Sequence, residues 1–216
     1  MVKVRRSVGA RMRDEYLRSP AEAEQTMGMP STTPRYWTVD DVWALPDDPR
    51  HRYEAVDGEL LVTPAPRTLH QDAVGELHVL LHAYCRETAA WRVRMAPSDV
   101  VVFGTNLVQP DLYLIRKRSG AEQHTSEKER SLPVLVIEVL SPSTARNDRV
   151  IKRGLYQRAG IECWIVDLDA RVIERWAVGA ERPDVYAEKV SWSAPGATVM
   201  LTVDVVALMA RVHDEA

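Results

Sequence analysis

The sequence predicts a fold of the α/β (α+β) class, in which helices flank a central mixed β-sheet and a β-hairpin lies on the N-terminal side. The apolar run at residues 133–142, bounded by prolines, is typical of a strand buried in the middle of a sheet. Residues 171–178 alternate between apolar and polar side chains, which indicates a strand nearer an edge. Residues 69–87 and 146–159 carry apolar side chains at helical spacing.

Length and composition are those of an ordinary globular protein. The chain has 216 residues, of which 45% are hydrophobic and 27% charged, and this fits one domain with a sizeable core. Residues 1–34 are basic and interrupted by prolines, so we expect a flexible N-terminal extension, with a nucleic-acid-binding arm as the alternative. Residues 35–216 are then expected to form a single domain.

Charge, hydropathy and cysteine content narrow the class of protein. A net charge of −3 gives no overall attraction for a polyanion, so any contact with nucleic acid must come from local basic side chains. No apolar run is long enough to span a bilayer. Cys85 and Cys163 are too few for a disulfide framework, and two reduced cysteines indicate the cytoplasm.

The ordered part of the chain is expected to begin with a short helix and a hairpin. Thr38 with Asp41 three residues later resembles a capping box, which predicts a helix through residue 44. Residues 52–62 predict a β-hairpin whose two-residue turn is Asp57-Gly58. Glu54 and Glu59 lie on opposite strands of this hairpin, and a solvated hairpin tip is the simplest interpretation of both.

The helix at residues 69–87 carries three histidines. His70 lies near its start, while His78 and His82 are four apart, a spacing that can present two imidazoles to one zinc ion. The sequence supplies no third ligand nearby, so surface or half-buried histidines are the expected state. Further strands are expected at residues 91–95, 99–103, 108–115, 162–167 and 184–192, an exposed loop at 116–131, and a closing helix at 203–212.

Two carboxylates stand inside apolar strands. Glu138 lies within the run at 133–142, and Asp111 follows Pro110 in the strand at 108–115. A buried carboxylate without a partner is costly, so it usually binds a metal or pairs with a cation. If the two strands are neighbours, Asp111 and Glu138 would offer oxygen ligands to Mg²⁺. Lys152, one turn after Asp148 on the next helix, could orient a water or neutralise charge on a phosphate.

These residues carry a resemblance to a known family. Pro110-Asp111 followed by Glu138-Val-Leu140 resembles the site of PD-(D/E)XK nucleases, and residues 37–208 resemble the Uma-two-type putative restriction endonuclease family. The matching segments are Tyr53 to Leu60, Gln109 to Leu112, Val136 to Thr144, Asp148 to Lys152, Leu155-Tyr156, Ala159-Gly160 and Trp164 to Asp167.

The resemblance implies a restriction-endonuclease-like core and a set of site residues. Asp111 matches the motif aspartate and Glu138 the second acidic position, both as metal ligands and catalytic residues. The expected lysine two residues after Glu138 is Leu140, and the matching lysine is Lys152 on the following helix. Glu54 or Glu59 fills the place of an upstream acidic ligand, with Glu59 slightly preferred.

The implied activity is hydrolysis of phosphodiester bonds in nucleic acid, with DNA as the expected substrate and Mg²⁺, or alternatively Mn²⁺, as cofactor. A homodimer would suit the cutting of both strands. The alternative is a catalytically inactive module of the same fold that binds nucleic acid or protein, which Leu140 and the near-neutral charge favour. Asp99 and Gln109 are further candidates for the pocket wall, and Asp167 is expected to cap a turn.

Overall fold

The computed structural model describes residues 35–117 and 132–215. Residues 35–216 form one compact unit. The expected extension at residues 1–34, and most of the expected loop at 116–131, lie outside the described residues. Within the described ranges, no helix is both long enough and apolar enough to cross a membrane.

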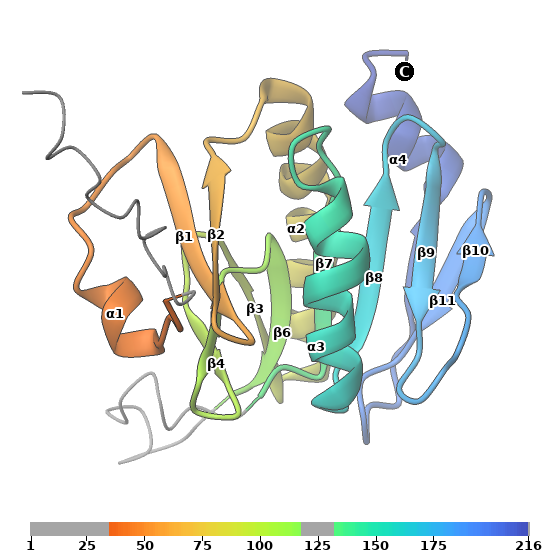
Figure 1. Ribbon diagram of the computed structural model, residues 1–216. Coiled ribbons are helices and arrows are strands. Elements are labelled where there is room, and N and C mark those ends of the chain that lie inside the picture. Colours follow the sequence, from red (N-terminus) through yellow and green to blue (C-terminus); the bar gives the residue numbers. More distant parts are fainter. Residues whose placement is uncertain (1–34, 118–131, 216) are drawn as a thin grey trace, which may run out of the picture. The chain divides into compact units, whose positions relative to one another are not determined.

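A six-stranded mixed sheet forms the centre of the unit (Figure 1). Its order is β10-β9-β8-β7-β6-β3. β7 and β8 are parallel, and the other neighbouring strands are antiparallel. The strands are β3 Trp91–Met95, β6 Leu112–Arg116, β7 Leu135–Val139, β8 Glu162–Asp167, β9 Val172–Trp176 and β10 Asp184–Tyr186. The predicted fold class and its central mixed sheet are confirmed.

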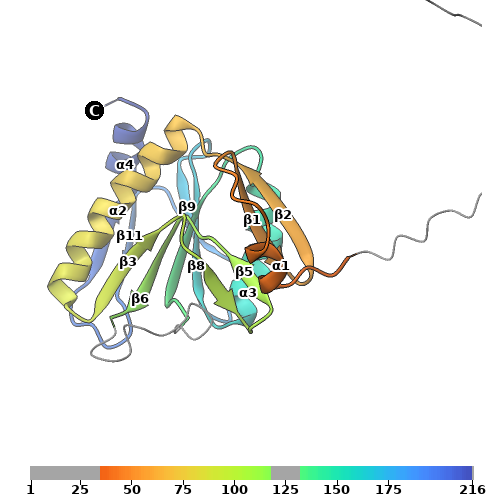
Figure 2. The ribbon, with the colours of Figure 1, turned by 90° about the vertical axis from the view of Figure 1, so that its left-hand side faces the viewer.

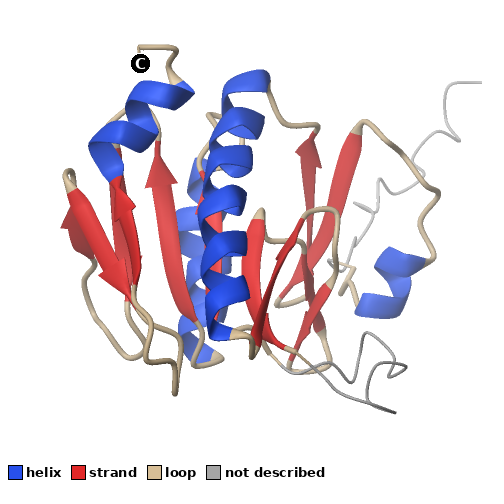
Figure 3. Ribbon diagram, turned by 180° about the vertical axis from the view of Figure 1, so that it is seen from behind, coloured by secondary structure: helices blue, strands red, loops and turns tan. Residues whose placement is uncertain are grey.

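Helices cover both faces of this sheet. The long helix α2 (Thr68–Thr88) and the closing helix α4 (Val205–Val212) lie on one face (Figure 3). A helical run on the other face consists of the π-helix η3 (Asn147–Lys152) and the helix α3 (Arg153–Arg158) (Figure 1). Successive side chains of β7 enter the two resulting cores alternately, so the strand is buried along its whole length, as predicted for residues 133–142.

A second sheet of four strands packs beside the first (Figure 2). Its order is β2-β1-β5-β4, with β1 His51–Val56, β2 Glu59–Pro64, β4 Val100–Val102 and β5 Asn106–Val108. The predicted hairpin is confirmed: Val56 pairs with Glu59 across Asp57 (φ 51°) and Gly58 (φ 85°). Both turn residues have positive φ, the geometry that favours Asp-Gly in a two-residue turn.

The short helix α1 (Val39–Trp43) has the predicted capping box. The Asp41 N–H donates to Thr38 Oγ1 (3.2 Å), and the Thr38 N–H donates to Asp41 Oδ2 (3.0 Å). Each residue therefore satisfies a backbone donor of the other. Val39 and Val42 bury the inner side of α1 against the second sheet.

Two expected strands differ from the structure. Residues 108–115 are not one strand, because β5 ends at Val108 in the second sheet and β6 begins at Leu112 in the first. Pro110 lacks the N–H that a ladder needs, which explains the break. Residues 184–192 also divide between sheets, since β11 (Lys189–Trp192) pairs with the unexpected strand β12 (Leu201–Asp204).

The strand β9 lies nearer an edge of the sheet, as its alternating pattern predicted. It lies between β8 and β10, and β10 is the edge strand. Its intermediate burial explains the alternation, because the side chains on one face stay partly accessible to solvent.

Candidate active site

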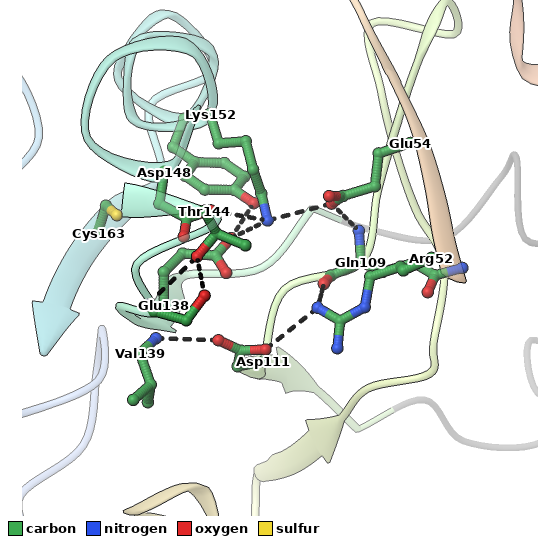
Figure 4. Close-up of polar contacts among 12 residues, drawn as sticks. Arg52, Glu54, Gln109, Asp111, Glu138, Val139, Thr144, Asp148, Lys152 and Cys163 are labelled. Carbon is green, nitrogen blue, oxygen red and sulfur yellow. Dashed lines mark hydrogen bonds and ion pairs between the residues drawn. The ribbon is translucent and has the colours of Figure 1, made fainter. Parts of the chain in front are cut away.

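The candidate site is a pocket of about 230 Å³ where the two sheets meet. The strand β1 contributes Arg52 and Glu54, while the segment between β5 and β6 contributes Asp111. The strand β7 contributes Glu138, and the π-helix η3 contributes Asp148 and Lys152. Figure 4 shows these side chains converging from separate elements.

Asp111 sits at the corner where the chain leaves the second sheet for the first. The sequence predicted that Asp111 lies inside a strand, but it directly precedes β6. Its Oδ2 accepts from the Val139 N–H (2.9 Å) and lies 3.0 Å from His70 Nε2. Its Oδ1 accepts from Arg52 Nη1 (3.1 Å). Burial alone would raise the pKa of Asp111, but the His70 hydrogen bond and the charges of His70, Arg52 and Lys152 lower it to about 2.

Glu138 is 1% exposed and has a different environment. Its Oε1 accepts from the Tyr156 hydroxyl (2.7 Å) and from Lys152 Nζ (2.8 Å). Burial raises the pKa of Glu138 to about 8, and the carboxylates of Asp148, Asp111 and Glu54 add to the rise against the opposing charge of Lys152. The pKa of Asp111 is thus lowered and that of Glu138 raised, although both carboxyl groups are buried in the same pocket.

Lys152 is the centre of an ion-pair network. Besides Glu138, its Nζ lies 3.1 Å from Glu54 Oε1 and 3.4 Å from Asp148 Oδ1. Desolvation would lower the pKa of Lys152, but the surrounding carboxylates raise it well above its usual value. The ammonium therefore stays charged. Lys152 is the last residue of the π-helix η3, and such wide turns are frequently found at functional sites.

Charge in the pocket is unevenly compensated. Arg52 and His70 face Asp111, whereas among the described residues Lys152 forms the ion pairs with Glu54, Glu138 and Asp148. Arg52 adds a weaker attraction to Glu54 and Glu138. Burial, together with the neighbouring carboxylates, raises the pKa of both Glu138 and Asp148. The group around Lys152 therefore has more carboxylate than cation, an imbalance that a proton or a divalent cation would relieve.

The chemistry of the donor set fits a hard divalent cation. No three His, Cys, Asp or Glu side chains in the described ranges are placed to hold a metal by themselves. Mg²⁺, however, commonly takes one or two carboxylates and completes its shell with water and substrate oxygens. Asp111 and Glu138 are the two carboxylates that β6 and β7 bring to one pocket.

Glu54, and not the preferred candidate Glu59, is the upstream acidic residue that lines the pocket. Glu59 pairs with Val56 at the tip of the hairpin, is exposed and does not line the pocket. Glu54 is 2% exposed and contacts Lys152. Glu54 lies two residues before Val56, about 7 Å along the strand. Glu59 therefore lies beyond the pocket although its side chain is on the same face.

Leu140 stands where a motif lysine was expected, and its side chain serves the core. It packs against the cluster that includes Leu155 and Ile165. The space near Glu138 is filled by Lys152 from the next helical run, so the relocated lysine proposed from the sequence does reach the pocket.

The remaining candidates lie outside this pocket. Gln109 Nε2 donates to Asp99 Oδ1 (2.8 Å), and both residues line a neighbouring pocket instead. Asp167 caps a turn as predicted, accepting from the Ala170 N–H (2.9 Å). The rings of His78 and His82 lie 5.8 Å apart, but within the described ranges no third ligand joins them.

Arg52, His70 and Tyr156 were missed as members of the site. Two of them left a local signal: Arg52 shares a face of β1 with Glu54, and Tyr156 follows Lys152 by four residues on one helical face. His70 left none, because it meets Asp111 across 41 residues of sequence.

Comparisons with known proteins agree with the fold. The family model Uma2, described as "Putative restriction endonuclease", matches residues 34–205. A solved structure described as a putative nuclease belonging to DUF820 from Anabaena variabilis matches with a TM-score of 0.66 and 18% identity. The match covers 82% of this chain and 99% of that chain, and at this identity it shows the fold alone. No curated protein matches the chain.

Proposed function

The chain belongs to the Uma2 family of putative restriction endonucleases, and on that premise we propose that it is a metal-dependent endonuclease acting on DNA. The reaction would be hydrolysis of a phosphodiester bond. The observation that carries the proposal is the position of Lys152 Nζ, 2.8 Å from Glu138 Oε1, in the pocket that also contains Asp111. An acidic pair and a lysine are thus assembled from three separate elements.

Asp111 and Glu138 would hold Mg²⁺ or Mn²⁺, which supplies Lewis acidity and lowers the pKa of a bound water. Asp111 stays ionised, because His70 and Arg52 lower its pKa. Glu138 holds a proton at neutral pH unless a further cation is present, because its pKa is raised to about 8. Tyr156 donates to Glu138 Oε1 and fixes the orientation of the carboxylate.

Lys152 supplies the positive charge at the reaction centre. Its pKa is raised well above the usual value, so the group cannot serve as a base near neutral pH. It would instead orient the attacking water and stabilise charge that develops on the phosphate. Glu54 and Asp148 hold the ammonium in place from two sides.

Plasmid nicking tests the proposal. The wild-type protein should nick supercoiled DNA with Mg²⁺ or Mn²⁺ and not with EDTA. Glu138→Gln should lower the rate at least about a hundredfold, because it removes a ligand charge and keeps the side-chain shape. Glu181→Gln, an exposed glutamate outside the pocket, is the matched control and should cut like wild type. Equal cutting by Glu138→Gln would refute the assignment.

The alternative is an inactive module that binds nucleic acid or protein. The observation in its favour is that Asp111 already accepts hydrogen bonds from Arg52 and Val139 and contacts His70. Calorimetry separates the two. Measurable duplex binding with no heat of Mn²⁺ or Mg²⁺ binding would select the inactive module.

The proposal places the reaction in the cytoplasm, where Cys85 and Cys163 remain thiols. Both are free and buried, which is compatible with a reducing compartment. Cutting both strands would be served by a homodimer, and sedimentation at working concentration tests that assembly.

A further inference from the structure

The candidate active site shares part of its lining with a second pocket. This pocket of about 220 Å³ also adjoins the start of α2, and three residues line both cavities: Arg67, His70 and Ser141. All three carry polar groups that can bond to a phosphate oxygen or to its hydration shell. The junction between the two cavities is therefore lined by polar groups, although leucine and proline side chains form part of the second pocket.

The helix α2 begins at this junction without a cap. Arg67 is its N-cap residue, no side chain caps the first turn, and the first turn has no acidic residue. A helix of 21 residues therefore presents the N–H groups and positive dipole end of its first turn uncompensated. The start of α2 is visible at the upper end of the helix in Figure 2, beside the β1–β2 hairpin.

A second observation at this place concerns His70. The residue is 8% exposed, its Nε2 contacts Asp111, and its Nδ1 has no hydrogen-bond partner. Within the described ranges, Nδ1 is the one buried side-chain nitrogen or oxygen in that condition. An unsatisfied buried polar atom is costly and calls for a specific explanation. Because Nδ1 is itself closed to solvent, a phosphate oxygen or a water becomes its partner only when the side chains that line the junction shift.

The other charges of the second pocket are largely accounted for. Arg149 Nη2 lies 2.7 Å from both Asp167 Oδ2 and Glu174 Oε1, so its charge is compensated. Asp169 adds one exposed carboxylate to the lining. Arg67 is exposed, and no described residue forms an ion pair or hydrogen bond with its guanidinium. Among the described residues of this lining, Arg67 is thus the cation available to a ligand.

We propose that the junction of Arg67, Ser141 and the first turn of α2 binds a backbone phosphate of the substrate strand, next to the phosphate held in the Asp111–Glu138 pocket. This inference rests on the proposed nuclease function and adds the path of the strand, from the first pocket across the start of α2 into the second. Ser141 Oγ lies 3.0 Å from the hydroxyls of Ser143 and Thr144, which hold it at the rim.

Oligonucleotide binding measured by fluorescence anisotropy in EDTA tests this site without requiring cleavage. Arg67→Ala should weaken binding about threefold to tenfold, and the slope of log K against log salt should decrease by about 0.7 to 0.9, the value of one phosphate contact. Arg86→Ala is the matched control, because Arg86 is an exposed arginine in the last turn of the same helix. It should leave affinity and slope unchanged.

Thr68→Glu provides a variant that cannot be explained by unfolding. A glutamate in the first turn compensates the helix dipole, so the melting temperature should rise. The same carboxylate repels a phosphate, so oligonucleotide affinity should fall. Stability and binding then move in opposite directions.

The outcomes separate this inference from the function on which it rests. If wild type binds the oligonucleotide and Arg67→Ala matches Arg86→Ala in affinity and slope, the phosphate site is wrong while the nuclease proposal stands. If wild type binds no oligonucleotide, inorganic phosphate is the second probe. Shifts of the Thr68 and Leu69 amide resonances on titration with phosphate support the site and count against the nuclease. Unchanged resonances would refute both the phosphate site and the nuclease proposal.

Discussion

Replacing Glu138 with glutamine should make the protein more stable at alkaline pH and leave its stability at pH 5 nearly unchanged. Glutamine has the shape of a protonated glutamate and can still accept from Tyr156 and Lys152 through one oxygen. The substitution removes the group whose ionisation is unfavourable in the folded state. The change therefore isolates the effect of burying that charge.

The direction follows from proton binding. The pKa of Glu138 is raised from 4.5 to about 8 in the folded protein, so between these values the folded state binds more protons than the unfolded state. Stability must then fall as pH rises through this window. The difference between the two pKa values corresponds to a loss of at most about 5 kcal/mol in the free energy of unfolding. The ammonium of Lys152 offsets part of the charge on Glu138. We therefore expect Glu138→Gln to be more stable than wild type by about 2 to 5 kcal/mol at pH 8.5.

Urea denaturation followed by tryptophan fluorescence between pH 5 and pH 9 measures the effect. The free energy of unfolding of Glu138→Gln minus that of wild type should be near zero at pH 5 and should grow as pH rises. Glu181→Gln controls for the loss of a surface charge. If Glu138→Gln is less stable than wild type at pH 8.5, Glu138 is an ionised partner of Lys152, and the reasoning on uncompensated charge is refuted.

Other substitutions test the same network and the fold around it. Lys152→Met should lower the free energy of unfolding at pH 8 by about 3 to 5 kcal/mol, because three buried carboxylates lose their cation; urea titrations measure this, and an unchanged midpoint would contradict it. Asp111→Asn should lower the free energy of unfolding by about 2 kcal/mol at pH 7, because the ionised carboxylate stabilises the fold. This cost should disappear as pH falls through the pKa of about 2. Acid unfolding curves check the pH range. Mg²⁺ should raise the melting temperature of wild type more at pH 8 than at pH 6, because its binding must displace the proton of Glu138. Asp111→Asn should abolish this increase. An equal increase in that variant would locate the metal elsewhere. Thr38→Ala should cost about 1 kcal/mol through loss of the capping box of α1, and wild-type stability in this variant would mean that α1 is held by packing alone.

Local sequence determined the elements whose signals lie within a few residues. The capping box at Thr38 and the Asp57-Gly58 turn specify their own backbone geometry, and both occur as predicted. The proline-bounded run at 133–142 is apolar on both faces, which is compatible with a central strand and not with an edge. Asp111 and Glu138 could be paired in advance for the same reason, because each is a carboxylate among apolar neighbours.

Tertiary structure decided what depends on contacts distant in sequence. Alternation in residues 171–178 predicted a strand nearer an edge, but only the pairing of β9 with β10 decided that one further strand covers it. Pro110 moves the chain from one sheet to the other and puts Asp111 at a corner, which a single strand at 108–115 would not do. How far each residue lies from the hairpin tip decided between Glu54 and Glu59. The partners of Asp111 come from β1 and α2, and no local pattern connects Arg52 or His70 with a residue more than 40 positions away.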